Sequence, residues 1–335
     1  MQQSFFEVGD RYNHLDKAED LLIKLSGMIN CQGLLLVIEP VHFKRTAKGG
    51  RPGTEPLVTT KCILLQPLYN LSDDSCEYQT NDRLSFKRFG GLLVPEKSLG
   101  TKTLWFYKER TKCKKLHDKI FDWLHGQIEV CVYVAQEGQI VDANLVAAHK
   151  PTGKDKKQLE KEVPLTKAQS SQTDNDTTFT KKNKKSHYDY KDHIQIDNKH
   201  KIVRKQVATT ASFHSSQEFE GLFGEEGNDS SYVWRDSAYR ILTNKGALKK
   251  KNLNSKVHER VCHNNLPSDG QEANNTTKSK TRVCVEYVFG YRATSAAGIF
   301  IHTIGLAKAE VKVTLKNVTY NIQRFVFLES KRLAG

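Results

Sequence analysis

The chain has 335 residues, and its 52 lysines and arginines exceed its 38 aspartates and glutamates, which gives a formal net charge of +14. This excess of positive charge favours an anionic polymer as partner, with nucleic acid the first candidate. No apolar run approaches the roughly 20 residues of a membrane-spanning helix. The first residues also lack the positive region of a secretory leader, so we expect a cytoplasmic protein with no membrane partner. The seven cysteines contain no Cys-x-x-Cys pair, which argues against a zinc module or a disulfide framework.

Residues 1–126 are predicted to form an all-α domain. Apolar side chains recur at helical spacing between residues 16 and 124, and a glycine-rich break at 49–53 separates two helical groups. A small helical bundle with basic later elements suits DNA binding, although charged helix faces are more often merely solvated. The basic residues on those later elements are Arg83, Lys87 and Arg88.

Residues 127–335 are predicted to form an α/β domain, because the apolar period changes from helical to alternating. Val130, Val132 and Val134 indicate a strand, and residues 140–146 indicate another. Residues 150–186 are rich in lysine and poor in large apolar side chains, so we expect a flexible basic loop with no secondary structure.

The following elements alternate between strands and helices. Residues 193–197 and 200–207 predict a hairpin, 217–223 a short helix, 231–236 a strand that ends in an acid, and 254–261 a further strand.

Two helices are predicted to close the chain. The first spans residues 278–293 and carries Glu286 beside a core-facing stripe of Val285, Val288 and Phe289. The second covers the sheet around residues 311–325. Its outward-facing residues are predicted to be Lys308, Lys312, Lys316 and Arg324.

Three acids stand inside apolar stretches: Asp142, Asp236 and Glu286. A carboxylate buried without a positive partner costs several kcal/mol, so three such acids suggest a cation site. Mg²⁺ prefers oxygen ligands, and two such ions can clamp a phosphodiester during in-line displacement. An isolated aspartate is more often an ordinary strand-end residue, so the neighbouring residues must decide.

The neighbouring residues form short sequence motifs that follow one another in a recognisable order. They are Ile140-Val-Asp-Ala143, Tyr188-Asp-Tyr-Lys-Asp-His193, Asp236-Ser-Ala-Tyr239, Val285-Glu-Tyr-Val-Phe-Gly290, Thr303-Ile-Gly-Leu306 and Asn317-Val-Thr-Tyr-Asn321. Together they resemble the DDE transposases of bacterial insertion sequences, in the insertion sequence five group of the insertion sequence four/five superfamily. The resemblance spans almost the whole chain. It implies an RNase H-like catalytic core, a mixed sheet flanked by helices, preceded by an all-α N-terminal DNA-binding domain.

The resemblance also implies roles for particular residues. Asp142, Asp236 and Glu286 would be the catalytic and metal-binding triad, with two Mg²⁺ ions for which Mn²⁺ can substitute. Such an enzyme cleaves DNA at the ends of its element and joins the freed end to target DNA. Its partners would be double-stranded DNA, both terminal inverted repeats and target, and further copies of itself in the bacterial cytosol. DNA contacts are expected from Arg282, Lys278, Lys280, Lys191 and His193, and in the N-terminal domain from Arg83, Lys87 and Arg88.

Two other functions stay open at this point. Relatives usually carry His-Asp-Ser where residues 214–216 stand, and a tyrosine and a lysine where Ser279 and Ala293 stand. A copy that has lost catalysis would remain as a sequence-specific DNA-binding protein. An RNase H-like nuclease would cut DNA without joining it.

Overall fold

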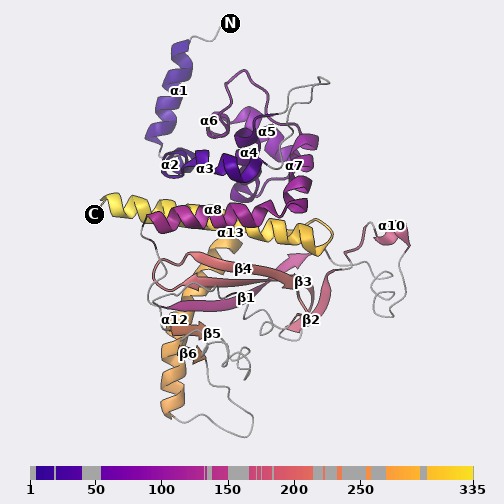
Figure 1. The fold of residues 1–335 in the computed structure, drawn as a ribbon, viewed down its shortest axis with the longest axis vertical. Coiled ribbons are helices and arrows are strands. Elements are labelled where there is room, and N and C mark those ends of the chain that lie inside the picture. Colours follow the sequence, from indigo (N-terminus) through magenta and orange to yellow (C-terminus); the bar gives the residue numbers. More distant parts are fainter. Residues whose placement is uncertain are drawn as a thin grey trace. The chain divides into compact units, whose positions relative to one another are not determined.

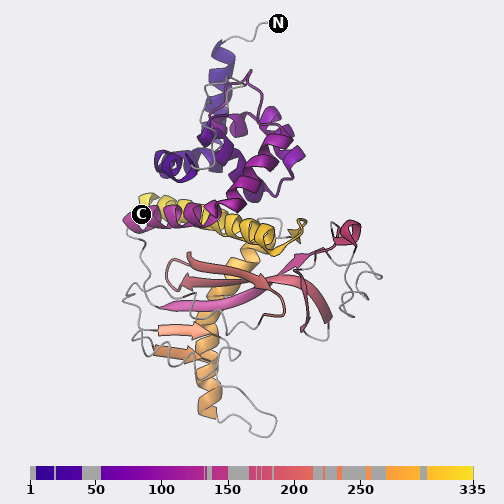
Figure 2. The same ribbon diagram turned by 45° about the vertical axis from the view of Figure 1, so that its right-hand side comes forward.

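The computed structural model contains two compact units. One comprises Met1–Cys131 with Val318–Gly335, and the other comprises Val132–Asn317. Figures 1 and 2 show the chain in two views. The described residues are 5–18, 20–39, 54–131, 133, 138–149, 166–170, 172–174, 176–182, 185–213, 222, 232–235, 254–257, 269–294 and 300–334.

Within the described residues, the chain up to Cys131 contains helices and no strand (Figure 1). These helices are α1 (Phe5–Lys17), α2 (Leu21–Met28), α3 (Cys31–Ile38), α4 (Pro56–Tyr69), α5 (Asp73–Asp82), α6 (Leu84–Gly90), α7 (Thr101–Cys113) and α8 (Leu116–Val130). Side-chain caps fix where several of them begin: Asp20, Asn30 and Ser72 each accept a hydrogen bond from a backbone N–H in the first turn of α2, α3 and α5.

The strand predicted at Val130 is wrong, because α8 continues through that residue. Leu124 and Ile128 are both fully buried and stand four residues apart, which is helical rather than alternating spacing. Val130 itself is 84% exposed. Val132 and Val134 lie outside the described residues.

Across the described ranges, no single helix has the length and apolar character that a membrane span requires. The pair α2 and α3 passes the same test of length and composition when taken together, with a bend of 77° between the two helices.

The second unit contains a mixed sheet whose centre is β1 (Gln139–Ala148). Its other strands are β2 (Thr178–Lys182), β3 (Lys185–Asp197), β4 (Val203–Thr210), β5 (Tyr232–Arg235), β6 (Asn254–Val257) and β7 (Phe300–Ile301). Strand β3 runs antiparallel to β1, β2 and β4, whereas β5 and β7 run parallel to β1, and β6 runs parallel to β5. The predicted hairpin is confirmed as β3 and β4, and the two later strands are confirmed over the residues described.

The register of β1 with β3 decides which side chains share a face of the sheet. Asp142 lies opposite Ile194 and Asn144 lies opposite Asp192. Because directly paired residues point to the same side, Asp142 and Asp192 share one face, and His193 points to the other.

Two long helices pack on the face that carries Asp142. Helix α12 (Asp269–Thr294) crosses the sheet in both ribbon views and contacts β1 and β5 (Figures 1 and 2). Its predicted stripe of Val285, Val288 and Phe289 is confirmed as buried. The first turns of α13 (Leu306–Ala334) join the same core through Ala309 and Val313.

The closing helix is more buried than its sequence suggested. Lys316 was predicted to face outward, but its side chain is buried and 4% exposed. Burial, together with the nearby charge of Arg292, lowers the pKa of Lys316 to about 8.

The lysine-rich segment contains some regular structure, so the expectation of none is wrong for part of it. Helix α10 (Lys167–Ser170) and strand β2 lie within residues 150–186. Two acids between α10 and β2 bind residues further along the chain. Asp174 accepts a hydrogen bond of 2.6 Å from the Tyr190 hydroxyl, and Asp176 accepts one of 2.7 Å from the backbone N–H of Leu306. Residues 150–165 lie outside the described ranges.

Gly138 makes the close approach between β1 and β5 possible. It has a φ of +96°, and a Cβ there would stand 2.0 Å from the ring of Trp234. Only glycine accepts this backbone angle readily, and no side chain fits beneath the indole.

Candidate active site on strand β1

Asp142 is a partly buried acid in the middle of the sheet, with its side chain 13% exposed. Its Oδ1 accepts a hydrogen bond of 2.8 Å from the backbone N–H of Ala143. Its Oδ2 lies 3.3 Å from Nε of Arg282 on α12. The positive partner that a half-buried carboxylate requires is therefore present.

Helix α12 presents the predicted glutamate one turn beyond Arg282. Arg282 and Glu286 are four residues apart and therefore lie on the same side of the helix. Glu286 is exposed, whereas its neighbour Val285 is fully buried. The ion pair between Arg282 and Asp142 thus joins the strand with the first acid to the helix with the third.

The second predicted acid, Asp236, lies outside the described residues. Strand β5 ends at Arg235, which pairs with Val141. In the part of the chain that the structure describes, no three acids, histidines or cysteines are grouped closely enough to hold a metal ion. The carboxylate oxygens of Asp142 and Glu286 are nonetheless the type of ligand that Mg²⁺ prefers.

A second acid on the same sheet face also binds α12. Asp192 on β3 is fully buried, and its Oδ2 accepts a hydrogen bond of 2.5 Å from Nη1 of Arg292. The same Nη1 donates to the side-chain oxygen of Asn317 on α13. Burial raises the pKa of Asp192, and the charge of Arg292 opposes that rise.

This cluster was not predicted from the sequence, although one signal for it is present. Asp192 alternates with Tyr190 and Ile194, so it occupies an inward position of an apolar strand face. An acid at such a position calls for a buried positive partner. Arg292 also continues the buried stripe of α12, four residues after Val288.

Three of the predicted DNA contacts have side chains that bind other parts of the fold. The His193 side chain is fully buried, and its Nε2 lies 2.8 Å from the Thr209 hydroxyl. Lys191 donates from Nζ to the carbonyl of Phe213 at 2.7 Å. Both residues also point away from the sheet face that carries Asp142. Lys87 is buried and donates to the carbonyls of Val94 and Glu96.

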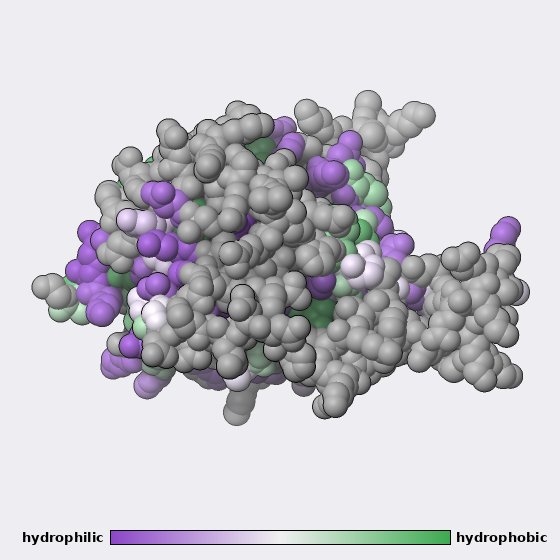
Figure 3. Space-filling view, turned by 90° about the horizontal axis from the view of Figure 1, so that it is seen from below, coloured by the Kyte–Doolittle hydropathy of each residue, from purple (hydrophilic) through white to green (hydrophobic). Residues whose placement is uncertain are grey.

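The other basic candidates keep surface that a phosphate can reach. Lys280 and Arg83 are exposed, and Lys278 is half-buried. Arg88 is exposed but forms an ion pair with Asp16 at 2.7 Å. Figure 3 shows one face of the molecule, on which described hydrophilic residues (purple) are interspersed with hydrophobic ones (green).

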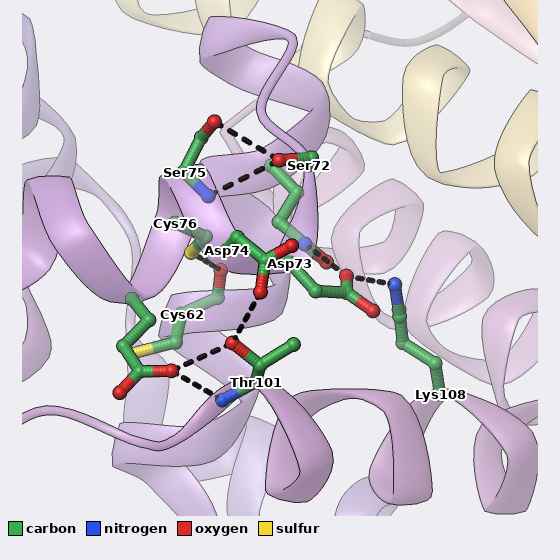
Figure 4. A network of polar contacts seen from close by, with 10 residues as sticks. Cys62, Ser72, Asp73, Asp74, Ser75, Cys76, Thr101 and Lys108 are labelled. Atoms are coloured by element: carbon green, nitrogen blue, oxygen red, sulfur yellow. Dashed lines mark hydrogen bonds and ion pairs between the residues drawn. The ribbon is translucent and has the colours of Figure 1, made fainter.

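An acidic groove lies between α5 and α7 in the helical unit. Thr101 donates from its backbone N–H and its hydroxyl to Glu77, and its hydroxyl also contacts Asp74 (Figure 4). The hydrogen bonds from Thr101 hold the pKa of Glu77 below its ordinary value. Asp82 also lines this groove, and so many carboxylates repel DNA.

Three comparisons with known proteins bear on the family of this chain. A family described as "Transposase domain (DUF772)" matches residues 10–110. The structure of a piggyBac transposase synaptic complex with hairpin DNA is similar at 9% identity, with a TM-score of 0.45 over 93% of this chain and 76% of that one. No curated protein matches the chain. A second family, described as "Transposase DDE domain", matches residues 135–322, which is more than half of the sequence. The chain therefore belongs to the family of transposases with a DDE domain.

Proposed function

We propose that this transposase belongs to the insertion sequence five group, and that it cleaves DNA at the ends of its element and joins the freed end to target DNA. Asp142, Asp236 and Glu286 are its catalytic acids in this proposal. The observation that carries it is the ion pair of Arg282 with Asp142, because this contact brings the helix of the predicted glutamate onto the strand of the first aspartate.

The order of the strands supports the RNase H-like part of the proposal. Strands β4, β3 and β1 are antiparallel neighbours, and β5 and β6 continue the sheet parallel to β1. An RNase H-like sheet has this order. Its first acid stands on the central strand and its second at the end of the adjacent parallel strand.

Chain continuity supports the role of Asp236, which lies outside the described residues. Asp236 follows Arg235, whose partner in β1 is Val141, the residue before Asp142.

Two Mg²⁺ ions, or Mn²⁺ in their place, would be held by the three acids. When bound, such ions stabilise the attacking and leaving oxygens of a phosphodiester. The chain's own cations have a separate part: Arg282, Lys278 and Lys280 neutralise DNA phosphates beside the reacting bond. These contacts position the DNA and carry no sequence information.

Recognition of the terminal repeats is assigned in this proposal to the all-α domain of residues 1–126. Arg83 and Arg88, both exposed, are its candidate contacts with DNA. The remaining residues, 127–335, form the catalytic domain, and its lysine-rich segment adds affinity that is independent of sequence. We further propose that copies of the chain act together on paired element ends in the bacterial cytosol.

The test uses purified protein, Mg²⁺ and a duplex that carries the inverted repeat flanking the gene. We expect nicking at the repeat end and joining to a second duplex, and both should fall below detection in Asp142→Asn while binding of the duplex remains. Asp118→Asn on α8 changes an acid outside the site and should leave both activities unchanged. Nicking that survives in Asp142→Asn would refute the assignment.

The same assay separates the two alternatives. Binding of repeat ends without nicking would indicate a copy that has lost catalysis, which the departures at residues 214–216, Ser279 and Ala293 favour. Nicking without any joined product would indicate a nuclease.

A further inference from the structure

The cluster of Asp192, Arg292 and Asn317 joins three elements at one buried point. Asp192 comes from β3, Arg292 from α12 and Asn317 from α13, and none of the three side chains is more than 2% exposed. The Asn317 amide also lies 3.4 Å from both carboxylate oxygens of Asp192. Each member therefore contacts the other two.

Buried charge of this kind contributes little to net stability. Removing two ions from water costs about as much as their attraction returns, and well-packed apolar residues of similar volume are often as stable. The buried ion pair instead contributes a defined direction, because a planar guanidinium donates hydrogen bonds only along its N–H bonds. The apolar stripe of α12 has no comparable directionality, because hydrophobic burial depends on area and not on angle.

The rotation of α12 about its own axis decides where Glu286 points. At the roughly 5–6 Å radius of helix side chains, a rotation of about 20° moves a side-chain atom by about 2 Å. A functional group must be held within about 0.5 Å and 10–20° of its working position. Apolar packing alone therefore leaves the glutamate insufficiently fixed.

Two arginines fix α12 on the same sheet face. Arg282 meets Asp142 at the site itself, where its side chain is 26% exposed. Arg292 stands ten residues further along and is buried. The contact of Arg282 with Asp142 competes with DNA phosphates and with metal ions for the same charged groups, whereas the contact of Arg292 with Asp192 lies away from both. The buried pair is thus the anchor that persists during a reaction.

We propose that Asp192 and Arg292, with Asn317, are positioning residues that set the rotation of α12 and so direct the Glu286 carboxylate toward Asp142. This inference rests on the proposed function, since it concerns the geometry of the same acids. Asp192 acts through Arg292 and α12, and it does not touch DNA or metal.

The test replaces the whole cluster by apolar side chains of similar size, as Asp192→Leu, Arg292→Met and Asn317→Leu in one chain. No buried charge is left unpaired in this variant, so we expect it to fold with a thermal midpoint close to that of the wild type. Its affinity for repeat DNA without metal should stay within about twofold. Its affinity for Mn²⁺, measured by paramagnetic resonance in the DNA complex, should fall about 10- to 100-fold, as for other groups that orient metal ligands.

A matched control removes a polar contact between the sheet and the other helix. Gln206 donates to the Thr314 hydroxyl at 2.7 Å, and the variant Gln206→Leu with Thr314→Val removes this link between β4 and α13. Its Mn²⁺ affinity should remain within twofold of the wild type, because α12 is not involved.

Arg292→Lys covers the case in which the apolar variant fails to fold. The lysine keeps the charge but loses the planar fork, so Mn²⁺ affinity should fall several-fold in a folded protein. Unchanged Mn²⁺ affinity in either folded variant would overturn the positioning role. If Asp142→Asn abolishes Mn²⁺ binding while these variants leave it intact, this inference fails alone; if the wild type binds no Mn²⁺, the proposed function and the inference fail together.

Discussion

Individual residues in the sheet show how burial alters their chemistry. His193 is enclosed between β1 and β4, and its one described side-chain contact is with the Thr209 hydroxyl. Burial, with the nearby charge of Lys191, lowers the pKa of His193 to about 4. The resemblance implied a DNA contact at His193. Strand alternation places its side chain on the sheet face away from Asp142.

His193 makes the stability of the fold depend on pH. Its pKa is lower in the folded chain than the ordinary 6.5. The contribution of the neutral, buried imidazole to the free energy of unfolding is therefore complete above pH 6.5 and is lost as the pH falls toward 4, because the unfolded chain binds the proton first. One pKa unit corresponds to about 1.4 kcal/mol, so the loss reaches about 3 kcal/mol near pH 4. Between pH 6.5 and 4, the free energy of unfolding should therefore fall by about 3 kcal/mol more in the wild type than in His193→Gln.

Urea unfolding at several pH values measures this difference. His302→Gln, at an exposed position, should follow the wild-type pH dependence. Parallel curves for the wild type and His193→Gln would show that His193 does not titrate with folding.

At the scale of elements, local pattern predicted what each segment is, and non-local contacts decided what it does. The 278–293 helix was predicted from its stripe of Val285, Val288 and Phe289, because helical spacing lies within one segment. The partner of Arg282 was not predicted, since Asp142 is far away in the sequence. The burial of Lys316 was missed for the same reason, because a charge close to it in the fold, Arg292, belongs to another helix.

The start of α13 depends on an acid from the distant lysine-rich segment. Asp176 accepts from the backbone N–H of Leu306, which is otherwise without a partner in its own helix. We expect Asp176→Ala to lower the free energy of unfolding by about 1 kcal/mol, the usual effect of losing an N-cap. Ser72→Ala, which removes the local cap of α5, is the matched control and should have a similar effect.

Amide hydrogen exchange distinguishes the two variants. Asp176→Ala should speed exchange in the first turn of α13, and Ser72→Ala should speed it in the first turn of α5 only. Unchanged exchange at Leu306 in Asp176→Ala would show that the long-range cap contributes nothing.

At the scale of the whole molecule, net charge predicted the partner more readily than any motif predicted the binding surface. The charge of +14 indicated nucleic acid before any element was assigned. It did not indicate which cations are available, because that depends on pairing and burial in the fold. Lys87, for example, donates to loop carbonyls, whereas Arg83 remains exposed. The three acids of the site come from short sequence motifs and stay a prediction, whereas the contact of Arg292 with Asp192 was found only in the fold.

The lysine-rich segment is predicted to add affinity for DNA of any sequence. We expect glutamine at Lys154, Lys156, Lys157 and Lys161 to weaken binding to repeat and unrelated duplexes equally. Each phosphate contact that is lost should reduce the slope of log K against log salt by about 0.9. The measurement is a titration of the full-length chain with labelled duplex between about 50 and 200 mM salt, the range over which counterion release dominates.

The control for this prediction changes charge in the same segment in the opposite sense. Replacing Asp155 by asparagine, and Glu160 and Glu162 by glutamine, should strengthen DNA binding and leave the lysine contacts in place. A uniform loss of affinity in the lysine variant, with a gain in the amide variant, would assign the effect to charge and not to a disturbed fold. A loss confined to the repeat duplex would instead mean that these lysines contribute to sequence recognition, which backbone contacts alone do not provide.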